Sequence, residues 1–123
     1  MADSGKKILI AEDEVSIANA LKLKLQHEKF EVTHVENGND ALTEIQNNSY
    51  DLILLDLMMP GKDGFGVLEE LKNKGSKAKV LVTSNLGQAE DRERAKSLGA
   101  TDFLVKSDTS LVEIVKRVRD LAS

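Results

Sequence analysis

The chain has 123 residues, carries a formal net charge of −4 and contains no cysteine. This length is typical of one domain with its own buried core, and the lack of cysteine excludes disulfides, thiolate chemistry and cysteine-bound zinc. The charges of both signs are interspersed and only one tyrosine and three phenylalanines occur, which argues against a nucleic-acid-binding surface.

We expect a single domain over residues 1–123, with residues 1–5 as a disordered tail. The sequence shows neither a signal peptide nor an apolar run of the ~20 residues that cross a bilayer. We therefore expect a soluble, cytoplasmic protein.

In chain order, five strand-like runs alternate with five helix-like segments. Residues 8–10 predict a buried strand, 15–28 a helix, 31–35 an edge strand, 39–46 a short helix and 52–55 a second buried strand. A helix over 64–74, a strand over 80–82, a polar helix over 88–98, a strand over 103–105 and a helix that begins after residue 110 complete the series. The buried runs lack alternation, which is typical of strands that are covered on both faces.

The first helix is the least obvious of these elements, because the letters LKLKL at 21–25 alternate as in a strand. Ile17, Leu21 and Leu25 keep a spacing of four, and the segment is rich in good helix formers, so the sequence favours a helix. The last helix has a clearer signal, since Ser110-x-x-Glu113 is a capping box at its start.

Strands that alternate with helices predict an α/β fold, (βα)5, with a parallel sheet that is covered on both faces. In such folds, ligands bind beyond the carboxyl ends of the strands. The residues that follow the predicted strands therefore define the candidate site. They are Glu12, Asp13, Glu14, Asp56, Thr83, Ser84, Asn85, Lys106, Ser107 and Asp108.

Three or four carboxylates and one lysine should gather at this edge. Clustered carboxylates repel one another, and a hard divalent cation such as Mg²⁺, which prefers oxygen ligands, would relieve the repulsion. Glu12, Asp13 and Asp56 could hold it, while Lys106 and Thr83 could bind phosphoryl oxygens. A carboxylate in these surroundings can act as a nucleophile toward phosphorus, so the pattern predicts phosphoryl transfer to an aspartate.

Five sequence blocks carry a resemblance to a known family: Glu12-Asp13, Asp56 with Met59-Pro60-Gly61, Asp63-Gly64, Thr83, and Phe103-x-x-Lys106. Together they resemble the receiver (phosphoacceptor) domain of two-component response regulators, of the chemotaxis-regulator type, over residues 6–122. The resemblance implies a flavodoxin-like, doubly wound, three-layer sandwich whose five parallel strands have the order 2-1-3-4-5.

The resemblance also implies a role for each matching position. Asp56 would be the phosphoacceptor, and Glu12, Asp13 and Asp56 would bind Mg²⁺ (or Mn²⁺) with the backbone carbonyl of Met58. Thr83 and Lys106 would contact the phosphoryl group, and Thr83 and Phe103 would form the conformational switch. Met58 and Asn85 would tune the rate of hydrolysis. Ser107 departs from the family, which commonly has proline there after a cis peptide bond; whether the Lys106–Ser107 bond is cis or trans stays open.

On this resemblance, the phosphodonor is a sensor histidine kinase, a phosphotransfer protein or a small phosphodonor. On the same resemblance, the domain is a signalling phosphoacceptor and not an enzyme that acts on other substrates. It catalyses only its own phosphorylation and dephosphorylation. Its output is a changed surface on the fourth helix, fifth strand and fifth helix, read by an effector protein or a fused output domain. We expect a monomer before phosphorylation and no direct contact with nucleic acid or membrane. Dimerisation through that surface is an option after phosphorylation, and the oligomeric state on activation stays open.

Two other functions stay open at this point. A receiver fold can serve as a docking module without phosphorylation, and Ser107 keeps that alternative in play. An aspartate-nucleophile phosphatase is the other, but that class wants a second aspartate two residues after the nucleophile, where this chain has Met58.

Overall fold

The fold is a five-stranded parallel sheet between two layers of helices. The computed structural model describes residues 5–59, 61, 63–84 and 89–122. The strands are β1 (Lys7–Ala11), β2 (Glu31–Val35), β3 (Leu52–Asp56), β4 (Lys79–Ser84) and β5 (Asp102–Val105), in the order β2-β1-β3-β4-β5. The helices are α1 (Val15–His27), α2 (Gly38–Asn47), α3 (Gly64–Lys74), α4 (Ala89–Ser97) and α5 (Leu111–Ala122), with a short 3-10 turn η1 (Lys106–Asp108). The predicted fold class and strand order are confirmed.

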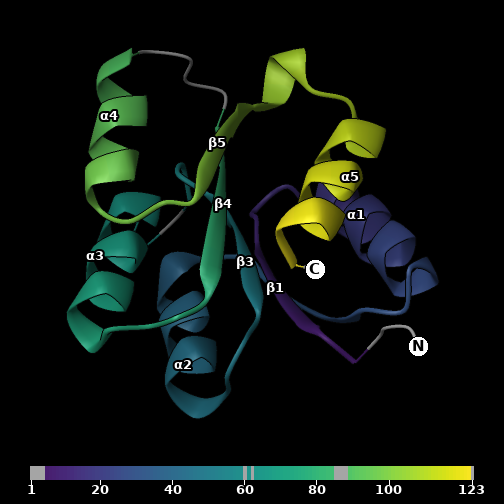
Figure 1. Ribbon diagram of the computed structural model, residues 1–123, viewed down its shortest axis with the longest axis horizontal. Coiled ribbons are helices and arrows are strands. Elements are labelled where there is room, and N and C mark those ends of the chain that lie inside the picture. The colour runs from purple at the N-terminus through teal and green to yellow at the C-terminus, as the bar shows by residue number, and fades with distance from the viewer. Residues whose placement is uncertain (1–4, 60, 62, 85–88, 123) are drawn as a thin grey trace.

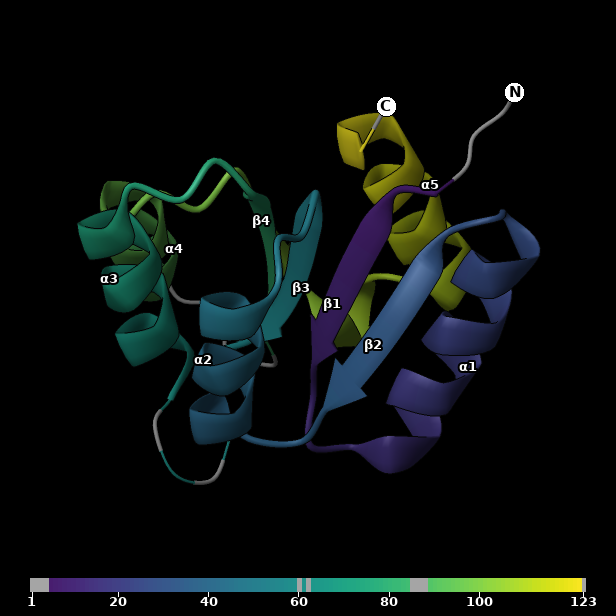
Figure 2. The same cartoon turned by 90° about the horizontal axis from the view of Figure 1, so that it is seen from below.

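The two helical layers are separate in Figures 1 and 2: α1 and α5 cover one face of the sheet, and α2, α3 and α4 cover the other. Successive side chains of a strand point to opposite faces. Ile8 and Ile10 accordingly pack in the core with α1 and α5, whereas Leu9 and Ala11 pack in the core with α2 and α3. This double burial explains why β1 and β3 carry apolar residues without alternation.

The edges of the sheet are less buried than its centre. Every residue of β3 is buried, whereas β2 and β5 contain no fully buried residue. Burial of apolar surface therefore fixes β3 most firmly, and β3 carries Asp56 at its end.

Local capping agrees with the predicted helix ends. The Asp63 side chain accepts a hydrogen bond from the backbone N–H of Gly66, and Gly75 ends α3 in the left-handed conformation at φ 67°. The Ser110 hydroxyl and the Glu113 carboxylate exchange hydrogen bonds with each other's backbone N–H, so the capping box is formed. The segment with the alternating letters is helical, with Leu21 and Leu25 buried. The predicted first residue of the fourth helix, Gln88, lies outside the described residues.

Helix α4 has the smallest buried face of the five helices as far as they are described, with Ala95 as its one buried residue. Two guanidinium groups hold it instead. Arg94 lies 4.1 Å from the ring centroid of Phe65 on α3, and Arg92 lies 5.2 Å from that of Phe103 on β5. The predicted polar helix is therefore observed over the described residues, and aromatic contacts of its arginines add to its small buried core.

Within the described residues, the longest helices are too short and too polar to cross a membrane.

Candidate functional site

Parallel strand order brings the three predicted acidic residues together. Ala11 at the end of β1 pairs with Leu55 of β3, so Glu12 and Asp13 follow β1 beside Asp56. One carboxylate oxygen from each of Glu12, Asp13 and Asp56 lies within 4.8 Å of the others. Glu12 and Asp56 are buried at 3% exposure each, and Asp13 is exposed. The site thus has two buried carboxylates and an outer one that reaches solvent.

Lys106 follows β5, which lies two strands away from β3 in the sheet, and its side chain contacts these carboxylates. Its Nζ lies 2.6 Å from Glu12 Oε1, 3.1 Å from Asp56 Oδ2 and 3.4 Å from Glu14 Oε1. The Lys106 side chain is only 9% exposed, so its charge is paired within the site instead of being solvated. The lysine was predicted at this edge, but its contact with Glu14 was not.

Electrostatics explain why these groups require one another. Burial, followed by the negative charge of Glu12, raises the pKa of Asp56 to about 7, although Lys106 opposes the rise. Burial lowers the pKa of Lys106, but hydrogen bonds and attraction to Glu12 and Asp56 outweigh it, so the net pKa is raised. The site therefore holds more negative charge than one lysine compensates, which is the condition under which a bound cation is favoured.

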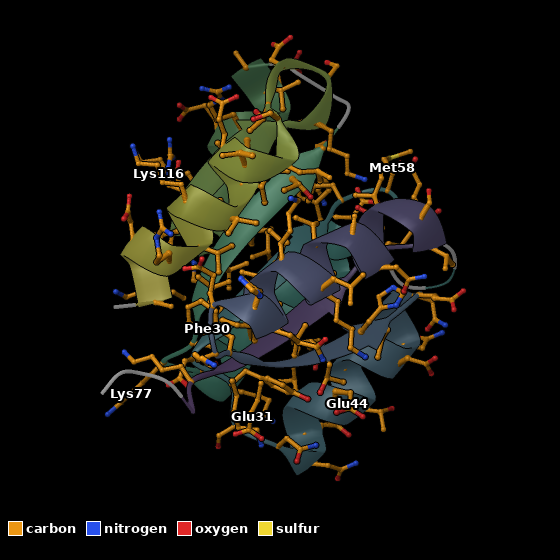
Figure 3. The ribbon with its side chains drawn as sticks, turned by 90° about the vertical axis from the view of Figure 1, so that its right-hand side faces the viewer. Phe30, Glu31, Glu44, Met58, Lys77 and Lys116 are labelled. Carbon is orange, nitrogen blue, oxygen red and sulfur yellow. The ribbon has the colours of Figure 1, made fainter. Side chains whose placement is uncertain are left out.

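Three oxygen donors of this kind fit a hard divalent cation. Carboxylates are the side-chain ligands that Mg²⁺ prefers, and it commonly keeps several waters, so an exposed third ligand such as Asp13 suits it. The backbone carbonyl of Met58 stays a predicted ligand. The described contact of Met58 with the site is through its backbone N–H, which donates to Asp56 Oδ1 at 3.2 Å. Met58 is 59% exposed and lies at the surface, at the upper right of Figure 3.

Thr83 lies on the other side of Asp56. The two residues are register partners between β3 and β4, and the backbone carbonyl of Thr83 accepts a hydrogen bond from Leu57 N–H at 3.2 Å. Thr83 and Ser84 are both buried. Asn85, the second predicted rate-tuning position, lies outside the described residues.

Phe103 lies on the edge strand β5, where it pairs with Val82, one residue before Thr83. Its ring is partly buried against the core under α3 and α4, and Arg92 covers it. The structure therefore places Phe103 at the junction of β5 and α4, away from the carboxylates. The Lys106–Ser107 peptide bond is trans, as are the other peptide bonds of the described residues.

Two supporting residues were missed by the sequence interpretation. The His34 ring N–H donates to the backbone carbonyl of Glu12 at 2.8 Å, so this histidine fixes the chain beside the acidic pair. Gly64 was predicted only as the first residue of a helix and as part of a family sequence block. A Cβ on Gly64 would lie 2.6 Å from Leu57 Cα and 2.7 Å from the Asp56 carbonyl oxygen. Only glycine lets α3 begin this close to the end of β3.

This combination defines a flavodoxin-like α/β domain with an acidic, lysine-paired site at the carboxyl edge of its sheet. Residues 8–119 match the family model of the response regulator receiver domain. The chain belongs to this family of two-component signalling domains, and the predicted resemblance is confirmed.

Curated relatives agree with the family. The chain is 40% identical over 116 residues to the probable transcriptional regulator ycf27 of Cyanophora paradoxa, covering 94% of this chain and 48% of that protein. It is 36% identical over 115 residues to the transcriptional regulatory protein ResD of Bacillus subtilis, covering 94% of this chain and 47% of that protein. The chain thus spans about half the length of these relatives.

Solved structures show the same fold. The receiver domain of the Francisella response regulator 1452 superposes with a TM-score of 0.89 at 32% identity, over 96% of this chain and 97% of that one. The response regulator TrrA of Thermotoga maritima, solved in complex with Mg²⁺-BeF, gives a TM-score of 0.81 at 34% identity, over 94% and 98% of the two chains.

Proposed function

We propose that this domain receives a phosphoryl group on Asp56 from a phosphohistidine of a sensor kinase or phosphotransfer protein, or from a small phosphodonor. One observation carries the proposal: a buried carboxylate, Asp56, lies 3.1 Å from the Lys106 ammonium and beside two further carboxylates at the ligand-binding edge of the sheet. Family membership and the Mg²⁺-BeF complex of TrrA support it.

The transfer needs an ionised Asp56 and a compensated phosphoryl charge. One Asp56 oxygen attacks phosphorus and forms the P–O bond, while the P–N bond to histidine breaks and the imidazole nitrogen keeps the electron pair. The Lys106 ammonium would donate to a phosphoryl oxygen once it gives up its contact with Asp56 Oδ2. The Thr83 hydroxyl, on the neighbouring strand β4, would donate a hydrogen bond to a second phosphoryl oxygen.

The metal set in this proposal is Glu12, Asp13, Asp56 and the Met58 backbone carbonyl. Bound Mg²⁺ supplies the positive charge that keeps Asp56 ionised and neutralises the incoming phosphoryl group. The donor chemistry of the three carboxylates supports this assignment, with Mn²⁺ as an alternative cation. Asp13→Asn should weaken Mg²⁺ binding strongly in a calorimetric titration, whereas Glu69→Gln on the exposed face of α3 should leave it unchanged.

Phosphorylation would change the surface formed by α4, β5 and α5. In this proposal Thr83 moves toward the phosphoryl group and Phe103 turns inward to the space that Thr83 leaves. The contact of Arg92 with the Phe103 ring supports it, because reorientation of the ring would alter what holds α4. Met58 and Asn85 would set how fast the phosphoryl group is hydrolysed.

The partners follow from this cycle. A sensor kinase or phosphotransfer protein supplies the phosphoryl group, and an effector protein or fused output domain reads the α4, β5 and α5 surface. The domain would be cytoplasmic, monomeric before phosphorylation and able to dimerise through that surface afterwards. It would catalyse only its own phosphorylation and hydrolysis.

Intact-mass analysis with acetyl phosphate and Mg²⁺ tests the proposal. One phosphoryl adduct should form in the unmodified protein, and none in Asp56→Asn or in the presence of a chelator. No adduct with several phosphodonors would contradict the proposal and favour a phosphorylation-independent docking module. Steady turnover of phosphate esters would favour a phosphatase instead.

A further inference from the structure

A second charged site lies at the amino edge of the sheet, opposite the phosphoacceptor site. Here Lys6, Lys74, Lys77 and Lys79 line a hollow of about 460 Å³, which we call the lysine hollow. All four lysines are exposed, and the chain as a whole is acidic, with a net charge of −4. A local cluster of like charges on a molecule of opposite net charge is a feature that general solubility does not explain.

The parallel fold itself creates the cluster. Lys6 precedes β1 and Lys79 begins β4, so both lie at the amino ends of strands, while Lys74 ends α3 and Lys77 lies in the following loop. The length of β3 separates this edge from Asp56 by roughly 15 Å, given a rise of about 3.3 Å per residue. Figure 3 shows Lys77 and Met58 at opposite ends of the molecule.

The charge of the lysine hollow is only partly compensated within the described chain. Asp51 is the one carboxylate among the described residues of the lining, and its Oδ2 accepts a hydrogen bond from the backbone N–H of Lys7 at 2.8 Å. No described residue forms a side-chain hydrogen bond or ion pair with the Lys77 ammonium. The balance at the hollow is therefore positive.

Three of the lysines already have a structural partner. The ammonium groups of Lys6 and Lys79 donate to the carbonyls of Ala122 and Leu121 at the end of α5, the latter at 2.7 Å. Lys74 Nζ lies 3.5 Å from the carbonyl oxygen of Ile45 on α2. These contacts stabilise helix ends, but they use one of the three N–H donors of each ammonium. They also order these three side chains around the hollow before a ligand binds, so less side-chain entropy is lost on binding.

We propose that the lysine hollow binds a small anion with two or more linked phosphate groups, such as pyrophosphate or the phosphate chain of a nucleotide. Lysine is a point charge with rotatable donors, and it binds phosphate oxygens without demanding a fixed geometry. The four ammonium groups come from the residue just before β1, the end of α3, the following loop and the start of β4. They surround a volume within the range of about 300–1,000 Å³ of small-molecule sites. One phosphate would reach few of them, whereas linked phosphates can contact several.

Amide NMR titration of the whole chain with pyrophosphate, in the absence of Mg²⁺, tests this proposal. Shifts should be confined to residues 6–7, 48–51 and 74–79, and should be absent at Leu57 and Met58. The double variant Lys77→Gln/Lys79→Gln should bind at least about tenfold more weakly, because it removes two charge-assisted contacts. Lys24→Gln/Lys116→Gln, which removes the same charge from α1 and α5, is the matched control.

The comparison of ligands identifies the anion, and single variants guard against misfolding. Tighter binding of ATP than of pyrophosphate would indicate a nucleotide, whereas equal binding would indicate a free polyphosphate. Lys77→Gln alone, which breaks no described contact, should still weaken binding. The absence of localised shifts, or equal weakening in both double variants, would overturn the proposal. Asp56→Asn should bind pyrophosphate normally, so this result and that of the phosphorylation assay are independent.

Discussion

Lys106 Nζ lies closer to Glu12 than to Asp56, at 2.6 Å against 3.1 Å. The lysine therefore separates two buried carboxylates and does not belong to the phosphoacceptor alone. Removing it leaves Glu12 and Asp56 buried, close together and without their shared cation, which is the costly way to break a buried ion pair.

Lys106→Met should lower the free energy of unfolding of the metal-free protein by about 3 kcal/mol. Mg²⁺ should recover part of this loss, because a bound cation replaces the missing charge. Urea unfolding with and without Mg²⁺ measures both effects. Lys116→Met, at an exposed position of α5, is the control and should change little; equal losses in the two variants would contradict the electrostatic argument.

Asp56→Asn should stabilise the metal-free protein above neutral pH. The pKa of Asp56 is raised to about 7, so the folded state binds a proton more tightly than the unfolded state does. This group's contribution is complete at pH values below its ordinary pKa and is lost as the pH rises through about 7. The variant lacks this loss, so its advantage should reach about 2 kcal/mol at pH 8 after solvent screening and shrink toward pH 4. Urea unfolding across this range measures it, and a difference that does not vary with pH would count against the prediction.

Gly64→Ala should destabilise the protein by about 2 kcal/mol, because its Cβ would meet the backbone of Asp56 and Leu57 at the end of β3. Circular dichroism during thermal unfolding would measure the loss. Gly75→Ala is the comparison. The added methyl group at Gly75 has open space around it, and the backbone there has a left-handed φ of 67°. Alanine should therefore lower stability by only about 1 kcal/mol, the cost of placing a non-glycine residue in that conformation. A loss at Gly64 no greater than at Gly75 would show that the loop relaxes.

Arg94→Ala should loosen α4 locally. The arginine loses its contact with the Phe65 ring, a contact of about 0.5–1 kcal/mol at an exposed site. Amide hydrogen exchange over residues 89–97 should accelerate several-fold, while exchange in β3 stays unchanged. Glu93→Ala, on the same helix but without a ring contact among the described residues, should have a smaller effect.

The capping box at the start of α5 predicts that the Glu113 carboxyl group has a lowered pKa. The backbone N–H and hydroxyl of Ser110 lower the pKa of Glu113 below its ordinary value. This group therefore contributes stability above the unfolded-state pKa, and the contribution disappears as the pH falls through the lower folded-state value. Carboxyl NMR titration should show the depression and its reduction in Ser110→Ala; an unchanged Glu113 titration in that variant would contradict the capping mechanism.

The elements and the acidic edge were predictable because they depend on short-range signals. Apolar runs without alternation identify strands that are covered twice, and parallel order then brings Glu12, Asp13 and Asp56 to one edge whatever the details of the loops. The contacts of Lys106 with Glu14 and of His34 with the Glu12 carbonyl were not predictable. Each depends on how far a long side chain reaches across neighbouring strands, which periodicity does not encode. The tight approach of Gly64 depends on the path of the loop after β3, which no local sequence signal specifies.

The small buried face of α4 has a consequence for engineering. A helix that contributes a single alanine to the core can be rewritten on its outward positions without repacking the sheet, provided that Ala95 and the two aromatic-bound arginines are kept. New recognition sequences could therefore be installed on α4 at little cost in stability, while the same number of changes in α5, which buries Ile114, Val115, Val118 and Ala122, would disturb the core.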